Sequence, residues 1–162
     1  MYRKTRAFKE ARLCRLYLEC LARSRDTYGF LVHGFVLMPD HVHLLLGFEQ
    51  EEVSMPLVIQ AVKRLFSTVA RQLLEAESHP AVERFTHTLK DGAQEWRFWA
   101  PGGGYDRNMF DPSTVYASLR YLHQNPVKAG LCSLDTDYQW SSARAYQGLD
   151  SMFEVDCLDP WG

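Results

Sequence analysis

Two strand-like runs separated by only two residues constrain the fold of this 162-residue chain most strongly. FLVHGFVLM (30–38) and HVHLLLGF (41–48) are rich in aliphatic, aromatic and β-branched residues, and the Pro-Asp pair between them is typical of a turn. The sequence therefore predicts an antiparallel hairpin. Because alternate side chains of a strand share a face, His41 and His43 should project together, while Val42 and Leu44 should point into the other layer.

Three longer segments carry apolar residues at the helical period of 3.6 residues. They cover residues 8–27, 54–77 and 111–125. Ser54 and Asp111 are predicted N-caps, and Pro126 should end the third helix at Asn125. The expected core stripe of the second helix is Ile59, Val62, Phe66, Val69 and Leu73. Residues 95–110 predict one or two short strands interrupted by a glycine loop.

These elements predict a single α+β domain over residues 1–162, with helices packed on a small antiparallel sheet in two layers. A hydrophobic content of 46% suits one domain that buries its own core. No apolar run approaches the roughly 18 residues that span a bilayer, and MYRKTRAFKEAR does not resemble a signal peptide. The four cysteines form no CxxC pair, so reduced thiols are expected. We expect a soluble, cytoplasmic protein.

Charge is distributed unevenly along the chain, although the net charge is only −2. Residues 1–25, the basic head, hold eight Lys and Arg against two Glu, whereas residues 131–162 hold one Arg against six Asp and Glu. A basic head is often only a solvated helix face, but it is also where a polyanion would dock. Residues 149–162 are interpreted as an acidic C-terminal tail near the groove for that polyanion, so its removal should strengthen non-specific binding.

Two groups of residues carry candidate chemistry. His41 and His43 can bind one divalent metal ion if a third ligand arrives from elsewhere, but a bare HxH pair is more often the solvated face of a hairpin. Tyr121 and Asn125 lie four residues apart and hence on one helix face. Taken alone, they fit a boundary aromatic residue and a cap before proline. Docked against the hairpin, they would supply a nucleophile and a carbonyl oxygen beside two imidazoles.

The chain resembles the single-tyrosine transposases of the HUH endonuclease class, and most closely the REP-associated tyrosine transposases of bacteria. The matching segments follow one another in family order between residues 10 and 147: HGFVLMPDHVHLLL, FWAPGGGYDRNMF, YLHQNPVKAGL and YQWSSARAY. This joint pattern is far more specific than HxH alone. The resemblance implies a ferredoxin-like HUH endonuclease fold, and single-stranded or hairpin DNA with palindromic repeats as the partner.

The resemblance also implies roles for individual residues. His41 and His43 match the metal ligands, Tyr121 matches the nucleophile, and Asn125 matches the polar residue that can complete the metal site. Two imidazoles and an amide oxygen suit Mg²⁺ or Mn²⁺, which would draw charge from a phosphodiester and fix it for in-line attack. Attack by the phenol would leave a 5′-phosphotyrosine and a free 3′-hydroxyl, so that strands can be cleaved and rejoined.

Several other residues are weaker candidates for DNA contacts. They are Arg3, Lys4, Arg6, Tyr105, Arg107 and Asn108. The last three follow a GGG stretch and could stack on or hydrogen-bond unpaired bases, but a plain flexible loop explains that stretch equally well. His33 and His123 lie near enough for proton transfer, although packed structural roles fit them better.

Three functions stay open at this point. The first is a metal-dependent transposase that cleaves and rejoins single-stranded DNA through Tyr121. The second is a domesticated protein that binds repeat DNA without productive cleavage, for which the low net charge and short N-terminus give support. The third is an unrelated small metal-dependent hydrolase in which Tyr121 is structural.

The segment before the first helix departs from the family pattern. Such proteins typically begin with a strand that pairs beside the metal-bearing one, whereas here only MYRKTRAF precedes the helix. We expect residues 1–7 to form at most a short or irregular strand, and the sheet to be one strand narrower than usual. Residues 41–48 would then expose an unpaired edge, which a homodimer would cover. The chain would be a truncated member whose cleavage depends on self-association.

Overall fold

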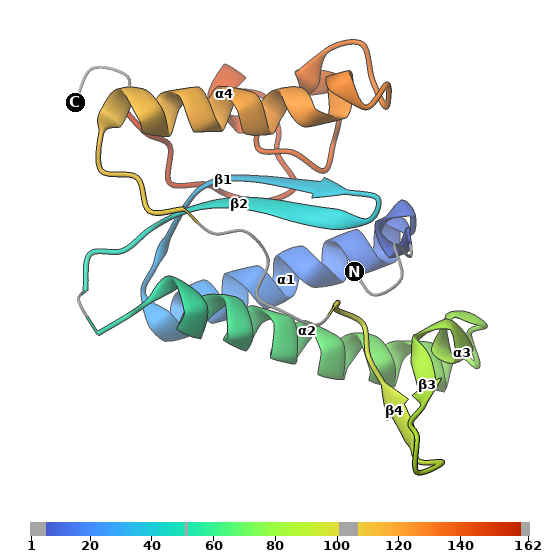
Figure 1. Ribbon diagram of the computed structural model, residues 1–162. Coiled ribbons are helices and arrows are strands. Elements are labelled where there is room, and N and C mark those ends of the chain that lie inside the picture. Colours follow the sequence, from blue (N-terminus) through green and yellow to red (C-terminus); the bar gives the residue numbers. More distant parts are fainter. Residues whose placement is uncertain (1–5, 51, 101–106, 160–162) are drawn as a thin grey trace.

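The computed structural model describes residues 6–50, 52–100 and 107–159. Helices lie on both faces of a central hairpin (Figure 1). In chain order the elements are η2 (Ala7–Lys9), α1 (Ala11–Tyr28), β1 (Leu31–Met38), β2 (His41–Gly47), α2 (Met55–Ala76), α3 (Ala81–Phe85), β3 (Thr86–Thr88), β4 (Gln94–Trp96), α4 (Pro112–Lys128), η3 (Asp135–Asp137) and η4 (Ala145–Gln147). The predicted α+β class is confirmed. Because α4 covers the second face of the hairpin, there are three layers where two were expected.

The hairpin sets which side chains share a face. β1 pairs antiparallel with β2, and the register places Met38 opposite His41 and Val36 opposite His43. Side chains of residues that face each other across a ladder point to the same side of the sheet. Both histidines therefore share a face with Val36 and Met38. A bulge at His33 separates this register from that of the first residues of β1.

The opposite face of the hairpin packs on α1 and α2. Phe35 and Leu37 of β1 are buried in the main core together with the inner faces of these two helices. Val42 and Leu44 of β2 pack against the same core. They therefore point away from the face that carries the two histidines, as the strand period predicts.

The buried stripe of α2 differs in part from the expected one. Its fully buried residues are Val58, Val62, Phe66, Ala70 and Leu74. Val62 and Phe66 belong to both sets, whereas Ile59, Val69 and Leu73 are only half-buried. The small Ala70 is buried in the main core, whereas the expected stripe contained only large apolar side chains.

Helix α4 packs across the face that carries the histidines. Its Leu119 and Leu122 form a second core cluster with Val36 and Met38. Gly34 allows the close approach, because a Cβ atom at this position would lie only 2.7 Å from Leu119 Cδ1. The helix is therefore seated directly on the hairpin.

Helix α4 also continues beyond its expected end at Asn125, through Pro126 to Lys128. Pro126 has no N–H to donate to Leu122 O, which is why a proline usually interrupts a helix. The side chain of Asn125 replaces that donor: its Nδ2 donates to Leu122 O at 3.2 Å and to Tyr121 O at 2.8 Å. The predicted helix end at Asn125 was wrong. The side-chain amide of Asn125 keeps the carbonyl of Leu122 hydrogen-bonded, in place of the N–H that Pro126 lacks.

The chain after α4 returns along the outer edge of β1. Leu37 N donates to Trp140 O at 2.9 Å, and Ser142 N donates to Phe35 O at 2.9 Å. Ser142 Oγ also accepts from Phe35 N at 3.0 Å. This segment covers the edge of β1 without forming a regular strand.

Asp156, one of the acidic residues near the end of the chain, bonds to the edge of β1. Asp156 N donates to Val32 O at 2.9 Å, and Asp156 Oδ2 accepts from Val32 N at 2.8 Å. Phe153 is buried, with its ring edge-on to that of Phe35 at a centroid distance of 5.6 Å. We call residues 153–158 the C-terminal strap. The strap is therefore not a free tail, which corrects the interpretation of these residues from the sequence. It contacts β1 at the end of the hairpin opposite its turn.

The expected first strand falls largely on residues 1–5, which lie outside the described residues. Directly after them, Ala7–Lys9 forms a 3₁₀ turn, and Phe8 N donates to Pro39 O at 3.1 Å. Within the described part of the chain, β2 pairs only with β1, while β3 and β4 form a separate hairpin beyond the end of α2 (Figure 1). The reduced width of the sheet relative to the family stays a prediction. No described helix is both long and apolar enough to cross a bilayer.

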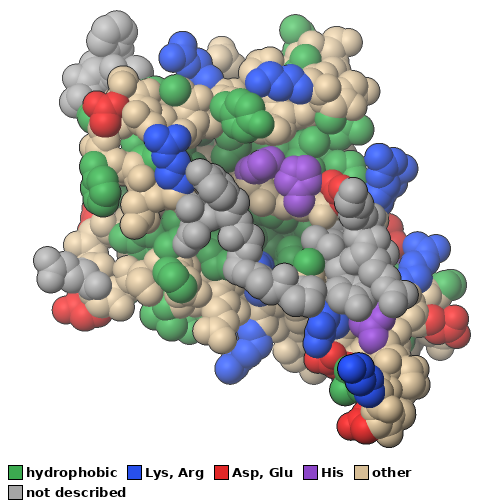
Figure 2. All heavy atoms as spheres, in the orientation of Figure 1, with side chains coloured by type: hydrophobic (Ala, Val, Ile, Leu, Met, Phe, Trp, Pro, Cys, Tyr) green, Lys and Arg blue, Asp and Glu red, His purple; other side chains and the backbone are tan. Residues whose placement is uncertain are grey.

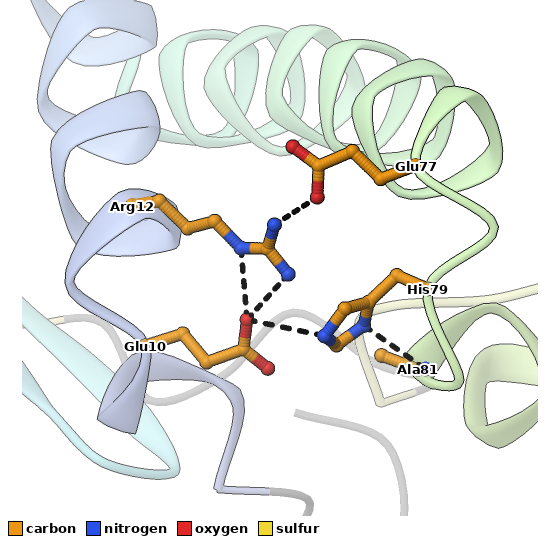
Figure 3. Close-up of polar contacts among 5 residues, drawn as sticks. All are labelled: Glu10, Arg12, Glu77, His79 and Ala81. Atoms are coloured by element: carbon orange, nitrogen blue, oxygen red, sulfur yellow. Dashed lines mark hydrogen bonds and ion pairs between the residues drawn. The ribbon is translucent and has the colours of Figure 1, made fainter.

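A polar cluster joins the start of α1 to the loop after α2 (Figure 3). Arg12 donates from Nε and Nη2 to Glu10 Oε2, both at 3.0 Å, and from Nη1 to Glu77. His79 Nε2 lies 3.8 Å from the same oxygen of Glu10, and His79 Nδ1 accepts from Ala81 N at 3.1 Å. One arginine of the basic head thus pairs with two carboxylates of the protein itself.

Candidate active site

The imidazoles of His41 and His43 lie side by side at the start of β2. Their Nε2 atoms are 3.0 Å apart, and the ring planes are inclined by 85°. Two nitrogens that bind one metal ion at about 2.1 Å and at right angles lie about 3 Å apart. The pair therefore has the spacing of two adjacent ligands. Figure 2 shows histidine side chains together on this face of the molecule.

Asp40 orients the first imidazole. Its Oδ1 lies 2.8 Å from Nδ1 of His41, and a carboxylate can only accept, so Nδ1 carries the proton. Nε2 of His41 is then the acceptor in the 3.0 Å hydrogen bond with Nε2 of His43, and the same lone pair is the one that a metal ion would use. The hydrogen bond from His41 lowers the pKa of Asp40, and the charge of Arg6 contributes in the same direction. Sequence reasoning missed Asp40, although its position directly before His41 was a signal.

The environment of His43 favours the neutral ring. This side chain is half-buried, and burial lowers its pKa, with the neighbouring His41 adding to the effect. A neutral imidazole is the form that binds a metal ion. Among the described residues, however, no group of three His, Cys, Asp or Glu side chains could hold a metal ion. A third protein ligand would have to be of another type.

Tyr121 and Asn125 lie on α4, the helix that covers the face with the histidines. The Tyr121 side chain is 58% exposed and so is open to a large substrate. Asn125 uses Nδ2 for backbone carbonyls, which leaves Oδ1 as its atom for a ligand. The structure therefore puts all four residues on the same side of the hairpin. Their roles as nucleophile and metal ligands stay predictions.

No family model matches the chain. Over 117 residues, or 72% of the chain, the sequence is 26% identical to a REP-associated tyrosine transposase of Haemophilus influenzae, and the match spans 61% of that relative's length. A solved REP-associated tyrosine transposase bound to a REP hairpin matches 98% of this chain and 82% of its own, with a TM-score of 0.60 and 16% identity.

The chain has the fold of a REP-associated tyrosine transposase. The predicted α+β fold and the predicted resemblance to REP-associated tyrosine transposases are thereby confirmed, at low sequence identity. In this fold the helix that carries Tyr121 packs on the hairpin that carries the two histidines.

Two further histidines have structural partners. His123 is buried on α4, and its Nε2 lies 2.8 Å from Ser142 Oγ. Burial lowers the pKa of His123 to about 4, so the ring is neutral at physiological pH. His33, at the bulge of β1, lies with Nδ1 2.7 Å from Asp156 O. These contacts fit packed residues better than proton-transfer groups.

The candidate DNA contacts are only partly described. Arg3, Lys4 and Tyr105 lie outside the described residues, whereas Arg6, Arg107 and Asn108 are exposed.

One further exposed residue was missed by sequence reasoning. The side chain of Phe110 is 92% exposed directly before the N-cap of α4. A large aromatic residue in a polar stretch before an N-cap was the available signal. An aromatic face of this kind is a surface on which an unpaired base can stack.

Proposed function

We propose that this protein cleaves and rejoins single-stranded DNA in or beside a hairpin, through Tyr121. The observation that carries the proposal is an exposed tyrosine on the helix that packs on the hairpin face with two adjacent imidazoles. The likeness to REP-associated tyrosine transposases supports it, and one of them is bound to a REP hairpin in its solved structure. We therefore take hairpin DNA with single-stranded flanks as the substrate class.

The proposal includes a divalent metal ion, Mg²⁺ or Mn²⁺, held by Nε2 of His41, Nε2 of His43 and Oδ1 of Asn125. A bound ion would withdraw charge from the non-bridging oxygens of the scissile phosphate. Asp40 supports this set because it keeps the proton of His41 on Nδ1. The backbone bonds of Asn125 support it because they fix which end of the amide stays available.

Tyr121 supplies the nucleophile in the proposed reaction. Its hydroxyl loses a proton to solvent, and the oxygen forms a bond to phosphorus as the bond from phosphorus to the 3′-oxygen breaks. The leaving oxygen takes up a proton and becomes a 3′-hydroxyl, while the 5′-phosphate stays on the tyrosine. The phosphotyrosine keeps the energy of the original diester, so the reverse step rejoins strands without a nucleotide cofactor.

A covalent adduct tests the proposal. Incubation with end-labelled hairpin oligonucleotides in Mn²⁺ should give a protein–DNA band that survives denaturing electrophoresis. Tyr121→Phe should abolish this band, because it removes the attacking oxygen. Tyr116→Phe is the matched control, since it removes a hydroxyl from the same helix and should keep the adduct. Cleavage that persists in Tyr121→Phe would contradict the tyrosine mechanism.

A second candidate is a domesticated protein that binds repeat DNA without productive cleavage. The lack of three converging His, Cys, Asp or Glu side chains among the described residues favours it. Hairpin binding without an adduct, in either Mg²⁺ or Mn²⁺, would support this alternative. Pairing of two copies into a homodimer stays a prediction that sedimentation would test. It is suggested by the edge of β2, which pairs with no second strand among the described residues.

A further inference from the structure

Lys128, the last residue of α4, lies against the candidate nucleophile. Its Nζ is 4.4 Å from the centroid of the Tyr121 ring. The two residues are seven positions apart, which is two helical turns, and both are exposed. A positive charge is thus held at the residue whose oxygen is proposed to attack a phosphate.

No ion pair among the described residues accounts for this placement. None of the ion pairs found among the described residues involves Lys128, so no carboxylate in this set draws its ammonium toward the ring. A lysine at a helix C-terminus interacts favourably with the helix dipole whether or not it touches an aromatic ring. A cation–π contact at an exposed site is weak and leaves the ammonium free to bind an anion.

We propose that Lys128 binds a non-bridging oxygen of the phosphate that Tyr121 attacks. This inference rests on the proposed function. A phosphorus placed for attack lies about 3–3.5 Å from the tyrosine oxygen. The oxygens of that phosphate are then within reach of an ammonium that lies over the same ring on a flexible four-carbon stem. Lys128 would hold the phosphate and offset the negative charge that grows on it during the displacement.

The chain offers matched variants for a test. Lys128→Gln removes the charge, Lys128→Arg keeps it, and Lys90→Gln removes one charge from the turn between β3 and β4, away from α4 (Figure 1). With hairpin oligonucleotides and Mn²⁺, Lys128→Gln should form the Tyr121 adduct about 10- to 100-fold more slowly than the wild type. Lys128→Arg should keep most of the rate, and Lys90→Gln should keep all of it.

A neutral phosphate analogue separates direct contact from a structural effect. In a Tyr121→Phe background, binding is measured to two oligonucleotides that differ only at the mapped cleavage position, one with a phosphodiester and one with a methylphosphonate. Lys128→Gln should weaken binding to the phosphodiester about three- to tenfold and leave binding to the uncharged methylphosphonate unchanged. Equal weakening for both oligonucleotides would overturn the proposal, because it would indicate a change in the fold.

The failure of this inference can be told apart from failure of the proposed function. An adduct in the wild type with an unchanged rate in Lys128→Gln would overturn only the role of Lys128. No adduct in the wild type would contradict the tyrosine mechanism itself, and the role of Lys128 with it.

Discussion

At the scale of single residues, the buried imidazole of His123 links the helix of the candidate nucleophile to the central hairpin. Its Nε2 lies 2.8 Å from Ser142 Oγ, and the same oxygen accepts from Phe35 N at 3.0 Å. One side chain on α4 is therefore tied to β1 through a single hydroxyl. Protonation of this ring would place a charge in the interior, which explains why its pKa is low.

We predict that His123 makes the protein less stable as the pH falls from about 6.5 to 4. The ring titrates near about 6.5 when unfolded but at about 4 when folded. In this window the unfolded chain binds a proton that the folded chain does not, which lowers the free energy of unfolding by up to about 3 kcal/mol.

Urea unfolding of metal-free protein at pH 7 and pH 4.5 measures this effect. His123→Gln keeps a hydrogen-bond donor for Ser142 and cannot titrate, so its stability should fall less between the two pH values. An equal fall in the wild type and in His123→Gln would show that other groups cause the pH dependence.

Sequence periodicity predicts the contacts of some site residues but not those of others. The adjacency of His41 and His43 follows from the period of a strand, because residues two apart share a face. The bond between Asp40 and His41, and the position of Lys128 over Tyr121, depend on side-chain rotamers. No periodic pattern contains that information: the position of Asp40 beside His41 was only a hint, and both contacts became visible in the structure.

At the scale of secondary structure elements, the edge of β1 is protected by irregular chain instead of by a third strand. Ser142 and Asp156 supply the bonds that an adjacent strand would otherwise make. The strap is held further by Arg25, whose Nη1 donates to Glu154 O at 2.9 Å and whose guanidinium lies over the Phe153 ring. A second arginine of the basic head is therefore engaged within the fold.

We predict that Phe153→Ala destabilises the protein by about 3 kcal/mol, because it empties a buried site between the strap and β1. Met152→Ala is the control, since that side chain is 43% exposed and should cost much less. Thermal unfolding measures both variants. An unchanged melting temperature in Phe153→Ala would contradict the structural role of the strap.

Removal of residues 149–162 should also lower the stability of the protein, because it removes the strap from the edge of β1. A free tail would instead give only a gain in DNA binding.

The three long helices and the central hairpin could be predicted because each repeats a local pattern over many residues, whereas the short α3 and the hairpin of β3 and β4 were not predicted. The true end of α4 could not, since it depends on one side-chain amide that replaces the missing N–H of Pro126. The strap could not be predicted either. Its bonds join Asp156 to Val32, residues 124 positions apart, without any regular period.

At the scale of the whole molecule, three layers bring together groups from distant parts of the chain. The imidazole pair belongs to β2 and the tyrosine to α4. The contact of Leu119 and Leu122 with β1 fixes how this helix lies on the hairpin. Compositional reasoning alone would not find this arrangement, because the net charge of −2 gives no sign of a polyanion as partner. The order of the motifs along the chain was the informative signal for the fold.

The proposed reaction links Tyr121 covalently to DNA, and mass spectrometry of the reacted protein detects that link. After reaction with a synthetic hairpin oligonucleotide in Mn²⁺, the protein is treated with nuclease and digested with trypsin. Cleavage after Arg120 and Lys128 releases YLHQNPVK, which contains a single tyrosine. We predict that this peptide carries the mass of a nucleotide joined through its 5′-phosphate to Tyr121. Cut DNA with an unmodified YLHQNPVK peptide, or a nucleotide on another peptide, would contradict the account.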